Sequence, residues 1–349
     1  MIPSLIPHSQ PTISEEDVEA VAQVVRSGRL TTGEERCRFE EEFADYVGAR
    51  GAVAISSGTA ALHLALQALD IGRGDEVLAP SYVCDSLLHA IHYVGAEPRV
   101  LDVGWHSNLE IETALANISE RTKAVIVPHM FGRPIDCRPL VGKVMVIEDC
   151  ALALGARFDG KQVGTIGEMA IFSFYATKLM TTGVGGMVTS SSKELLDRLL
   201  DLRWHADRDE YAVRYHYDMT DIQAALGRSQ LRRYSQFLQR RRELAAGYLK
   251  AFKGLEIVLP EIKPGTEPAW YRFVFRAPGR GDEVRRKARE GGVVLERPVF
   301  RGLHQCLGLN GFPITEALLE DNVSVPLYPS ITEEEVNHVV RTVHRVLQR

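Results

Sequence analysis

No C-x-x-C pair occurs in the sequence, and its five cysteines are scattered along 349 residues. Disulfide frameworks and zinc sites need cysteines at short, regular spacings, so this pattern favours reduced thiols and a cytoplasmic protein. The cysteines are Cys37, Cys84, Cys137, Cys150 and Cys306.

Long apolar runs are missing as well. Nowhere do about 18 apolar residues follow one another, as a membrane-spanning helix needs. The opening MIPSLIPHSQP lacks the basic and apolar segments of a signal peptide. We therefore expect a protein that neither crosses a membrane nor is secreted.

Positive charge is not in excess, since 41 Lys and Arg residues face 46 Asp and Glu residues. A formal net charge of -5 gives no general attraction for nucleic acid and favours small-molecule chemistry. The 11 histidines show no H-E-x-x-H or other ligand spacing, so no metal site is expected. The stretch GARFDGKQ resembles a phosphate-binding loop, but Gln162 stands where magnesium needs Ser or Thr.

What the sequence does contain is an alternation of helical and strand-like segments, which is typical of an α/β fold with a mostly parallel sheet. SEEDVEAVAQVVRSG predicts a helix with Ser14 as its N-cap and Gly28 as its stop. The basic segment 231–252 predicts one long helix, whose charged face is either solvated or binds nucleic acid. We predict a large domain at 1–240, including an N-terminal arm, and a smaller C-terminal α+β domain at 241–349.

The segment AISSGTAALHLAL predicts a strand that passes into a helix through Ser57, Gly58 and Thr59. Free backbone N–H groups and the helix dipole favour an anion at such a junction, and glycine allows it to come close. The pattern fits a phosphate site, although the same residue types also cap helices that bind nothing.

The strand-like KVMVIED ends in Glu148 and Asp149, at the edge where ligands collect in open α/β sheets. A carboxylate here either caps the next helix or keeps the ring nitrogen of a pyridoxal cofactor protonated. Further along, SFYATKLMTTGVGG opens with Ser173, a candidate phosphate contact, and sets Lys178 among small residues. Most lysines are solvated surface charges, but desolvation at such a place makes the amine nucleophilic towards an aldehyde.

The chain resembles the DegT/DnrJ/StrS family of pyridoxal-phosphate-dependent sugar aminotransferases in a series of ordered segments. These include LTTGEERCRFEEEFADYVGA, AISSGTAALHLAL, VPHMFGRPIDC, VIEDCALALGA, GTIGEMAIFSFYATK, TTGVGGMV, MTDIQAALGRSQL and SVPLYPSITEEEVNHVV. The resemblance covers most of the chain. It implies a fold-type-I α/β enzyme with a mixed, mostly parallel sheet, which works as a homodimer with shared active sites.

The resemblance also implies residue roles. Lys178 would form the covalent link with pyridoxal 5'-phosphate, and Asp149 would face the pyridine nitrogen. The contacts that it implies in the phosphate region are Ser57, Gly58, Thr59 and Ser173.

Three positions and the segment 216–218 depart from the family's pattern. Leu152 stands where Gln or His usually bonds the cofactor's phenolic oxygen, and Cys84 stands where an aromatic ring usually lies near the cofactor. Where the family has SFH, this chain has SFY, so Tyr175 stands in place of a histidine. The family's NYR-like segment reads HYD, so His216 replaces an asparagine that reaches the cofactor phosphate across the dimer.

The activity that the resemblance implies is transfer of an amino group from an amino acid, with glutamate as the expected donor, to a nucleotide-linked keto-sugar. We expect the sugar nucleotide to contact Thr31 in RLTTG, and Arg297 and Arg301 in ERPVFRGLH. Two alternatives stay open. One is another pyridoxal-phosphate reaction such as sugar dehydration, which the retained lysine disfavours; the other is a non-catalytic regulator, which Leu152 and HYD favour.

Overall fold

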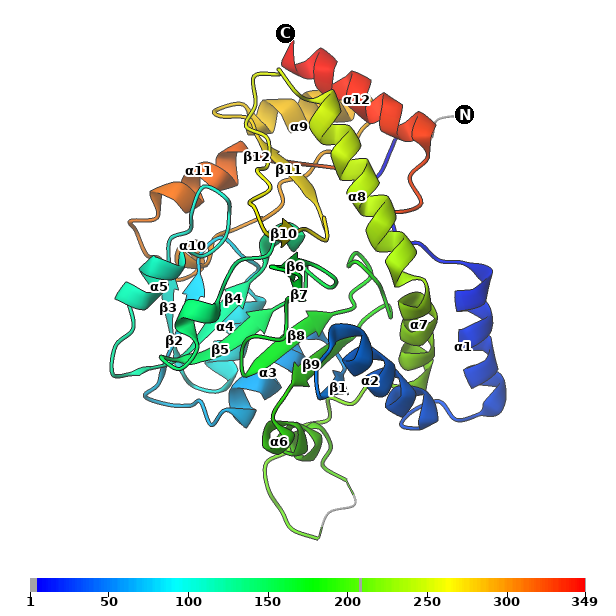
Figure 1. Ribbon diagram of the computed structural model, residues 1–349, viewed down its shortest axis with the longest axis vertical. Helices are drawn as coiled ribbons and strands as arrows, with labels where there is room; N and C mark the ends of the chain where they lie inside the picture. Colours follow the sequence, from blue (N-terminus) through cyan, green and yellow to red (C-terminus); the bar gives the residue numbers. More distant parts are fainter. Residues whose placement is uncertain (1–4, 207–208, 349) are drawn as a thin grey trace.

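A mixed sheet of seven strands forms the centre of the computed structural model, which describes residues 5–206 and 209–348 (Figure 1). The strand order is β1-β9-β8-β5-β4-β2-β3. Strand β9 runs antiparallel to both neighbours, whereas β3, β2, β4, β5 and β8 are parallel. The mixed, mostly parallel sheet expected from the sequence is confirmed. Its strands are β1 (Gly51–Ile55), β2 (Glu76–Pro80), β3 (Glu97–Leu101), β4 (Thr122–Pro128), β5 (Met145–Asp149), β8 (Met169–Ser173) and β9 (Gly186–Ser190).

Helices and two smaller sheets complete the described part of the chain. The helices are α1 (Glu15–Ser27), α2 (Glu34–Val47), α3 (Gly58–Ala68), α4 (Ser86–Tyr93), α5 (Ile111–Ala116), η1 (Met130–Gly132), η2 (Arg138–Leu140), α6 (Lys193–Arg203), α7 (Asp221–Arg232), α8 (Tyr234–Ala251), α9 (Gly281–Glu290), α10 (Leu303–Cys306), α11 (Pro313–Asp321) and α12 (Glu333–Leu347). One small sheet joins β6 (Arg157–Phe158), β7 (Lys161–Gln162) and β10 (Thr266–Glu267), and the other pairs β11 (Phe273–Arg276) with β12 (Asn322–Val325).

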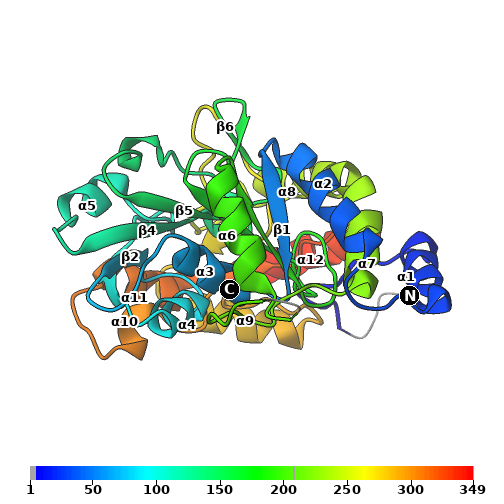
Figure 2. The same cartoon turned by 90° about the horizontal axis from the view of Figure 1, so that it is seen from below.

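Both faces of the large sheet are covered, because its strands carry apolar side chains on either side. On one face, Ile126 and Ile147 belong to a core that includes α3 and α4. On the other face, Phe172 meets Phe43 of α2 edge to face, with ring centroids 5.0 Å apart. Helix α1 lies beside α7, as both views show (Figures 1 and 2).

Two helix predictions can be compared directly with the structure. Helix α1 begins after Ser14 in a capping box and ends at Gly28, whose φ of 72° is in the left-handed region, so this prediction is confirmed. The long helix expected at 231–252 is confirmed as α8, although Leu231 and Arg232 belong to the end of α7. No helix among the described residues is long and apolar enough to cross a membrane.

A separate apolar core forms where α8, α9 and α12 pack on the pair β11 and β12. Ile6 of the N-terminal segment joins this core, and its N–H donates to the carbonyl of Gly292 at 2.9 Å. The boundary between residues 240 and 241 falls inside α8, and the division into two domains stays a proposal.

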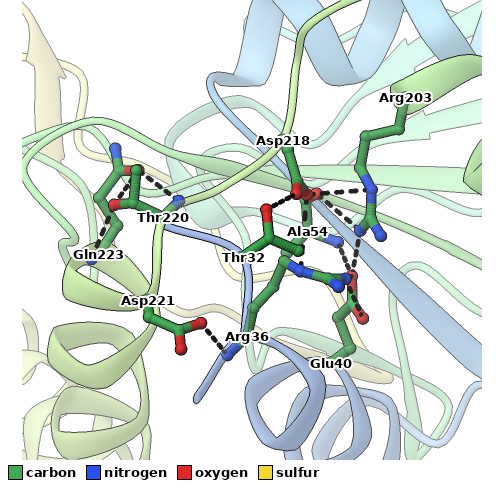
Figure 3. A network of polar contacts seen from close by, with 9 residues as sticks. All are labelled: Thr32, Arg36, Glu40, Ala54, Arg203, Asp218, Thr220, Asp221 and Gln223. Carbon is green, nitrogen blue, oxygen red and sulfur yellow. Dashed lines mark hydrogen bonds and ion pairs between the residues drawn. The ribbon is translucent and has the colours of Figure 1, made fainter. Parts of the chain in front are cut away.

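A buried network of charges ties α2 to β1 and to the segment before α7 (Figure 3). Arg36 donates to Glu40 at 3.0 Å, and Glu40 accepts the backbone N–H of Ala54 at 2.8 Å. Arg203 pairs with Glu40 and lies 3.1 Å from Asp218, which is also 3.6 Å from Nε of Arg36. Two guanidinium groups thus face two carboxylates, so the buried charges balance and hold Asp218 in place.

Glu148, whose side chain is fully buried, ties the end of β5 to the loop before β8. Its carboxylate accepts the N–H groups of Gly164, Ile166 and Gly167 at 2.9, 2.7 and 3.0 Å, and lies 3.2 Å from Nε2 of His129. Burial opposes ionisation, but His129 and the backbone donors hold the pKa of Glu148 below its ordinary value. The carboxylate therefore fixes the spacing between β5 and β8.

We predict that Glu148→Gln lowers the free energy of unfolding by about 3 kcal/mol, because an NH2 group then faces backbone donors in a buried site. Urea denaturation of the full chain measures this loss. Since the folded pKa is lowered, the wild-type advantage is present above the ordinary glutamate pKa of 4.5 and is lost as the pH falls through the lowered value. Glu120→Gln is the control, an exposed glutamate without a partner among the described residues. Equal midpoints for the two variants would contradict the prediction.

Candidate active site

A cavity of about 490 Å³ opens at the carboxyl ends of β4, β5 and β8. Parallel strands end at the same edge of a sheet, so Pro128, Asp149 and Ser173 are brought together there. The start of α3 forms a second wall, and two segments of the C-terminal part, 271–272 and 298–301, form a third. The cavity therefore lies between the large sheet and the C-terminal part of the chain.

Most of the site residues expected from the sequence line this cavity. They are Ser57, Gly58, Thr59, Cys84, Asp149, Leu152, Ser173, Lys178 and Arg301.

Three expected residues are not among the described residues that line it. The carbonyl of Thr31 accepts the N–H of Asp221, Arg297 pairs with Asp282 at 3.1 Å, and the exposed His216 packs edge to face on Trp204. Within one chain, the structure keeps these side chains apart from the cavity.

The start of α3 forms an anion site beside β8. Ser57 is the N-cap, and its hydroxyl accepts the N–H of Ala60 at 3.1 Å. A Cβ on Gly58 would lie 2.9 Å from Cβ of Ser173, and one on Gly186 would lie 2.5 Å from the carbonyl oxygen of Ser57. The two glycines thus allow α3, β8 and β9 to come close, with the positive end of α3 facing the cavity. This cradle fits the phosphate of the expected cofactor.

Asp149 ends β5 with 8% of its surface exposed. One carboxylate oxygen accepts the N–H of Ala151 at 3.0 Å. Burial raises the pKa of Asp149 above its ordinary value, although this N–H and the charge of Lys178 oppose the rise. Burial destabilises the ionised form of this carboxylate, and a positive charge in the cavity would stabilise it. Asp149 therefore fits a protonated ring nitrogen.

Lys178 lies in the turn between β8 and β9, and its backbone N–H donates to the carbonyl of Tyr175 at 2.8 Å. Its ammonium group is 5.3 Å from the ring centroid of Tyr271. Among the described residues no carboxylate oxygen lies within 4.0 Å of it. The side chain is half-buried and lines the cavity, so its amine is available to a ligand there.

Two further lining residues, Tyr271 and Arg272, carry no recognisable signal in the sequence. They follow Trp270, whose φ of 51° is unusual for a non-glycine residue, and they precede β11. Burial raises the pKa of Tyr271, but the charges of Lys178 and Arg272 outweigh burial and lower the pKa to about 7. No local pattern could have found these residues, because the turn at Trp270 depends on contacts with distant parts of the chain.

One cluster of possible metal ligands occurs in the described part of the chain, where atoms of His129, Glu148 and Cys150 lie within 4.8 Å of one another. The oxygens of Glu148 already accept three backbone N–H groups. Burial raises the pKa of the Cys150 thiol well above its ordinary value, so the sulfur keeps its proton. These features favour a structural role for the cluster.

Comparison with known proteins gives a match to the DegT/DnrJ/EryC1/StrS aminotransferase family over residues 11–344. GDP-perosamine synthase of Escherichia coli O157:H7 is 33% identical over 363 residues, which cover 97% of this chain and 98% of the relative. DesV of S. venezuelae has a similar structure, with a TM-score of 0.91, 32% identity, and coverage of 96% of this chain and 95% of that chain. The PLP form of the sugar aminotransferase Spr1654 from Streptococcus pneumoniae has a TM-score of 0.92 at 26% identity, over 99% of each chain.

The chain belongs to this family. It is a pyridoxal-phosphate-dependent aminotransferase of fold type I, as the sequence resemblance implied. One of these relatives is named as a synthase and another is described as a sugar aminotransferase, so they give no support to the non-catalytic alternative.

Proposed function

We propose that this family member transfers an amino group from glutamate to a keto-sugar linked to a nucleotide. The observation that carries the proposal is the meeting of Lys178, Asp149 and the anion site of α3 in one cavity. The retained Lys178 also argues against a dehydratase-like reaction. We further propose that the protein is a cytoplasmic homodimer.

The residues have distinct proposed roles around the cofactor. When bound, pyridoxal phosphate withdraws electrons from the carbon that carries the amino group, and so makes its proton acidic. Lys178 would hold the cofactor covalently, and its free amine would move the proton to and from that carbon. Asp149 keeps a proton on the ring nitrogen through its buried charge. The phosphate contacts are Ser57, Gly58, Thr59 and Ser173.

Leu152 and Cys84 line the cavity and are proposed cofactor contacts without a strong hydrogen-bonding group. Arg301 lines the same cavity, and its guanidinium donates to the carbonyl of Gln305 at 2.7 Å without an ion pair among the described residues. Its charge is thus free for the diphosphate of a sugar nucleotide. Thr31 and Arg297 stay proposed contacts for parts of this substrate that extend beyond the cavity.

A shared site in a homodimer is supported by the segment that carries His216. This segment extends past α6 in Figure 1. The exposed fractions of its residues Tyr211 and Val213 are 97% and 67%. Exposed apolar side chains on a protruding segment favour contact with another copy of the chain. We propose that His216 reaches the phosphate site of the partner subunit, where the ring N–H can donate to the phosphate.

We predict that Lys178→Ala loses the borohydride-reducible link to the cofactor and slows amination of the cofactor by glutamate by about 10³-fold or more. Mass spectrometry of the protein after reduction measures the link, and mass spectrometry of the released cofactor measures amination. Lys161→Ala, at an exposed lysine in β7, should behave as the wild type does. A reduced label on any lysine other than 178 would refute the assignment. A panel of nucleotide keto-sugars then identifies the acceptor by its amino-sugar product.

We predict that mixing Lys178→Ala with His216→Ala restores activity that neither variant has alone. In a mixed dimer, one site receives Lys178 from one subunit and His216 from the other, so about a quarter of all sites become intact after random exchange. The measurement is the glutamate half-reaction before and after the subunits are dissociated and mixed. Two outcomes count against a shared site: full activity of His216→Ala alone, or no recovery after exchange is shown by mass spectrometry.

A further inference from the structure

Two cations lie beside one aromatic ring in the cavity. The guanidinium carbon of Arg272 is 5.1 Å from the ring centroid of Tyr271, and the ammonium of Lys178 is 5.3 Å from the same centroid. Arg272 also donates to the Tyr271 hydroxyl at 3.4 Å. The lysine has a proposed role, whereas the arginine so far has none.

Arg272 has no ion pair in residues 5–206 and 209–348, whereas Arg203, Arg228 and Arg233 each pair with a carboxylate. Behind it lies a small pocket shared with His8. Burial, with the charge of Arg272, lowers the pKa of His8 to about 3, so this ring is neutral and adds no further positive charge. In the described part of the chain, no carboxylate therefore neutralises this half-buried guanidinium, and the Tyr271 ring that it contacts also contacts Lys178.

The backbone that carries Arg272 is fixed from two sides. The buried guanidinium of Arg241 donates to the carbonyls of Trp270 and Tyr271 at 3.3 and 3.2 Å. On the other side, the N–H of Ala269 donates to the carbonyl of Gly132 at 2.8 Å, where a Cβ would lie 2.9 Å from the nitrogen of Trp270. These contacts fix the backbone next to Arg272 before any ligand binds, and the guanidinium itself is placed by its contacts with Tyr271.

We propose that Arg272 binds a carboxylate of the amino donor and so selects an amino acid over a simple amine. The inference rests on the proposed function, because it takes Lys178 as the position where the donor's amine reacts. An arginine fork pairs with a carboxylate through two parallel hydrogen bonds, and this fork contacts the same Tyr271 ring as the reacting lysine does. The low pKa of Tyr271, about 7, is consistent with the excess of positive charge that a carboxylate would neutralise.

Arg272 and Arg301 therefore have different tasks in one cavity. Arg301 is exposed at the rim and is proposed to meet the diphosphate of the sugar nucleotide. Arg272 is half-buried and contacts the Tyr271 ring that Lys178 also contacts, where a donor that is smaller than a nucleotide can reach it. The two arginines form a matched pair for testing.

The first measurement is binding of glutarate, a dicarboxylate without an amine, to the holoenzyme by calorimetry. Arg272→Gln should weaken glutarate binding by about 10- to 100-fold, as expected for loss of a charge-assisted pair. Arg301→Gln should weaken binding of a nucleoside diphosphate more than that of glutarate. Equal glutarate affinity in the wild type and Arg272→Gln would overturn the proposal, whatever the reaction of the enzyme proves to be.

The second measurement separates specificity from a structural role. In the half-reaction, Arg272→Gln should raise the glutamate concentration needed for half-maximal rate by about 10- to 100-fold and leave the slow reaction with propylamine unchanged. Arg272→Lys should recover part of the loss, because it keeps the charge without the fork. Equal losses with glutamate and propylamine would mean that Arg272 only supports the fold. If the wild type reacts with no amino donor, the proposed function fails, and glutarate binding alone decides the role of Arg272.

Discussion

The buried carboxylate of Glu148 is the constraint on which the geometry of the cavity depends. Successive side chains of a strand point to opposite faces, so Glu148 and Asp149 at the end of β5 diverge. Glu148 takes three N–H groups of the loop 164–167 and thereby sets where β8 begins. Asp149 is left to face the cavity, with Ser173 at the end of β8 and Lys178 in the turn that follows. Glu148 thus supports the wall of the cavity, and Asp149 faces the cavity itself.

The remaining wall comes from the C-terminal part of the chain, and it supplies positive charge. Lys178, Arg272 and Arg301 line the cavity, against the buried Asp149 and the exposed Asp85. Such an excess suits substrates that carry carboxylates and phosphates. Because Arg241 and Gly132 fix the segment before β11 without any ligand, the cationic wall is a property of the fold.

In the segment 216–218, which departs from the family's pattern, the structure balances the charge of the changed residue. Asp218 replaces the arginine of the family's NYR-like segment, and here Arg36 and Arg203 balance its charge in a network with Glu40 (Figure 3). An acidic residue at this place therefore leaves no unpaired buried charge. The neighbouring His216 is exposed on Trp204, and its part in a shared site rests on the mixing experiment.

The sequence by itself determined the elements whose signals are local. Caps at Ser14 and Gly28 defined α1, and ordered motifs identified the family and the cavity residues from Ser57 to Lys178, because capping, glycine and apolar periodicity act within a few residues. Only the tertiary structure decided that Glu148 supports the loop 164–167. It also brought in Tyr271 and Arg272 and kept Thr31, Arg297 and His216 outside. These outcomes depend on which distant segments meet, and local patterns carry no information about the register and packing that bring them together.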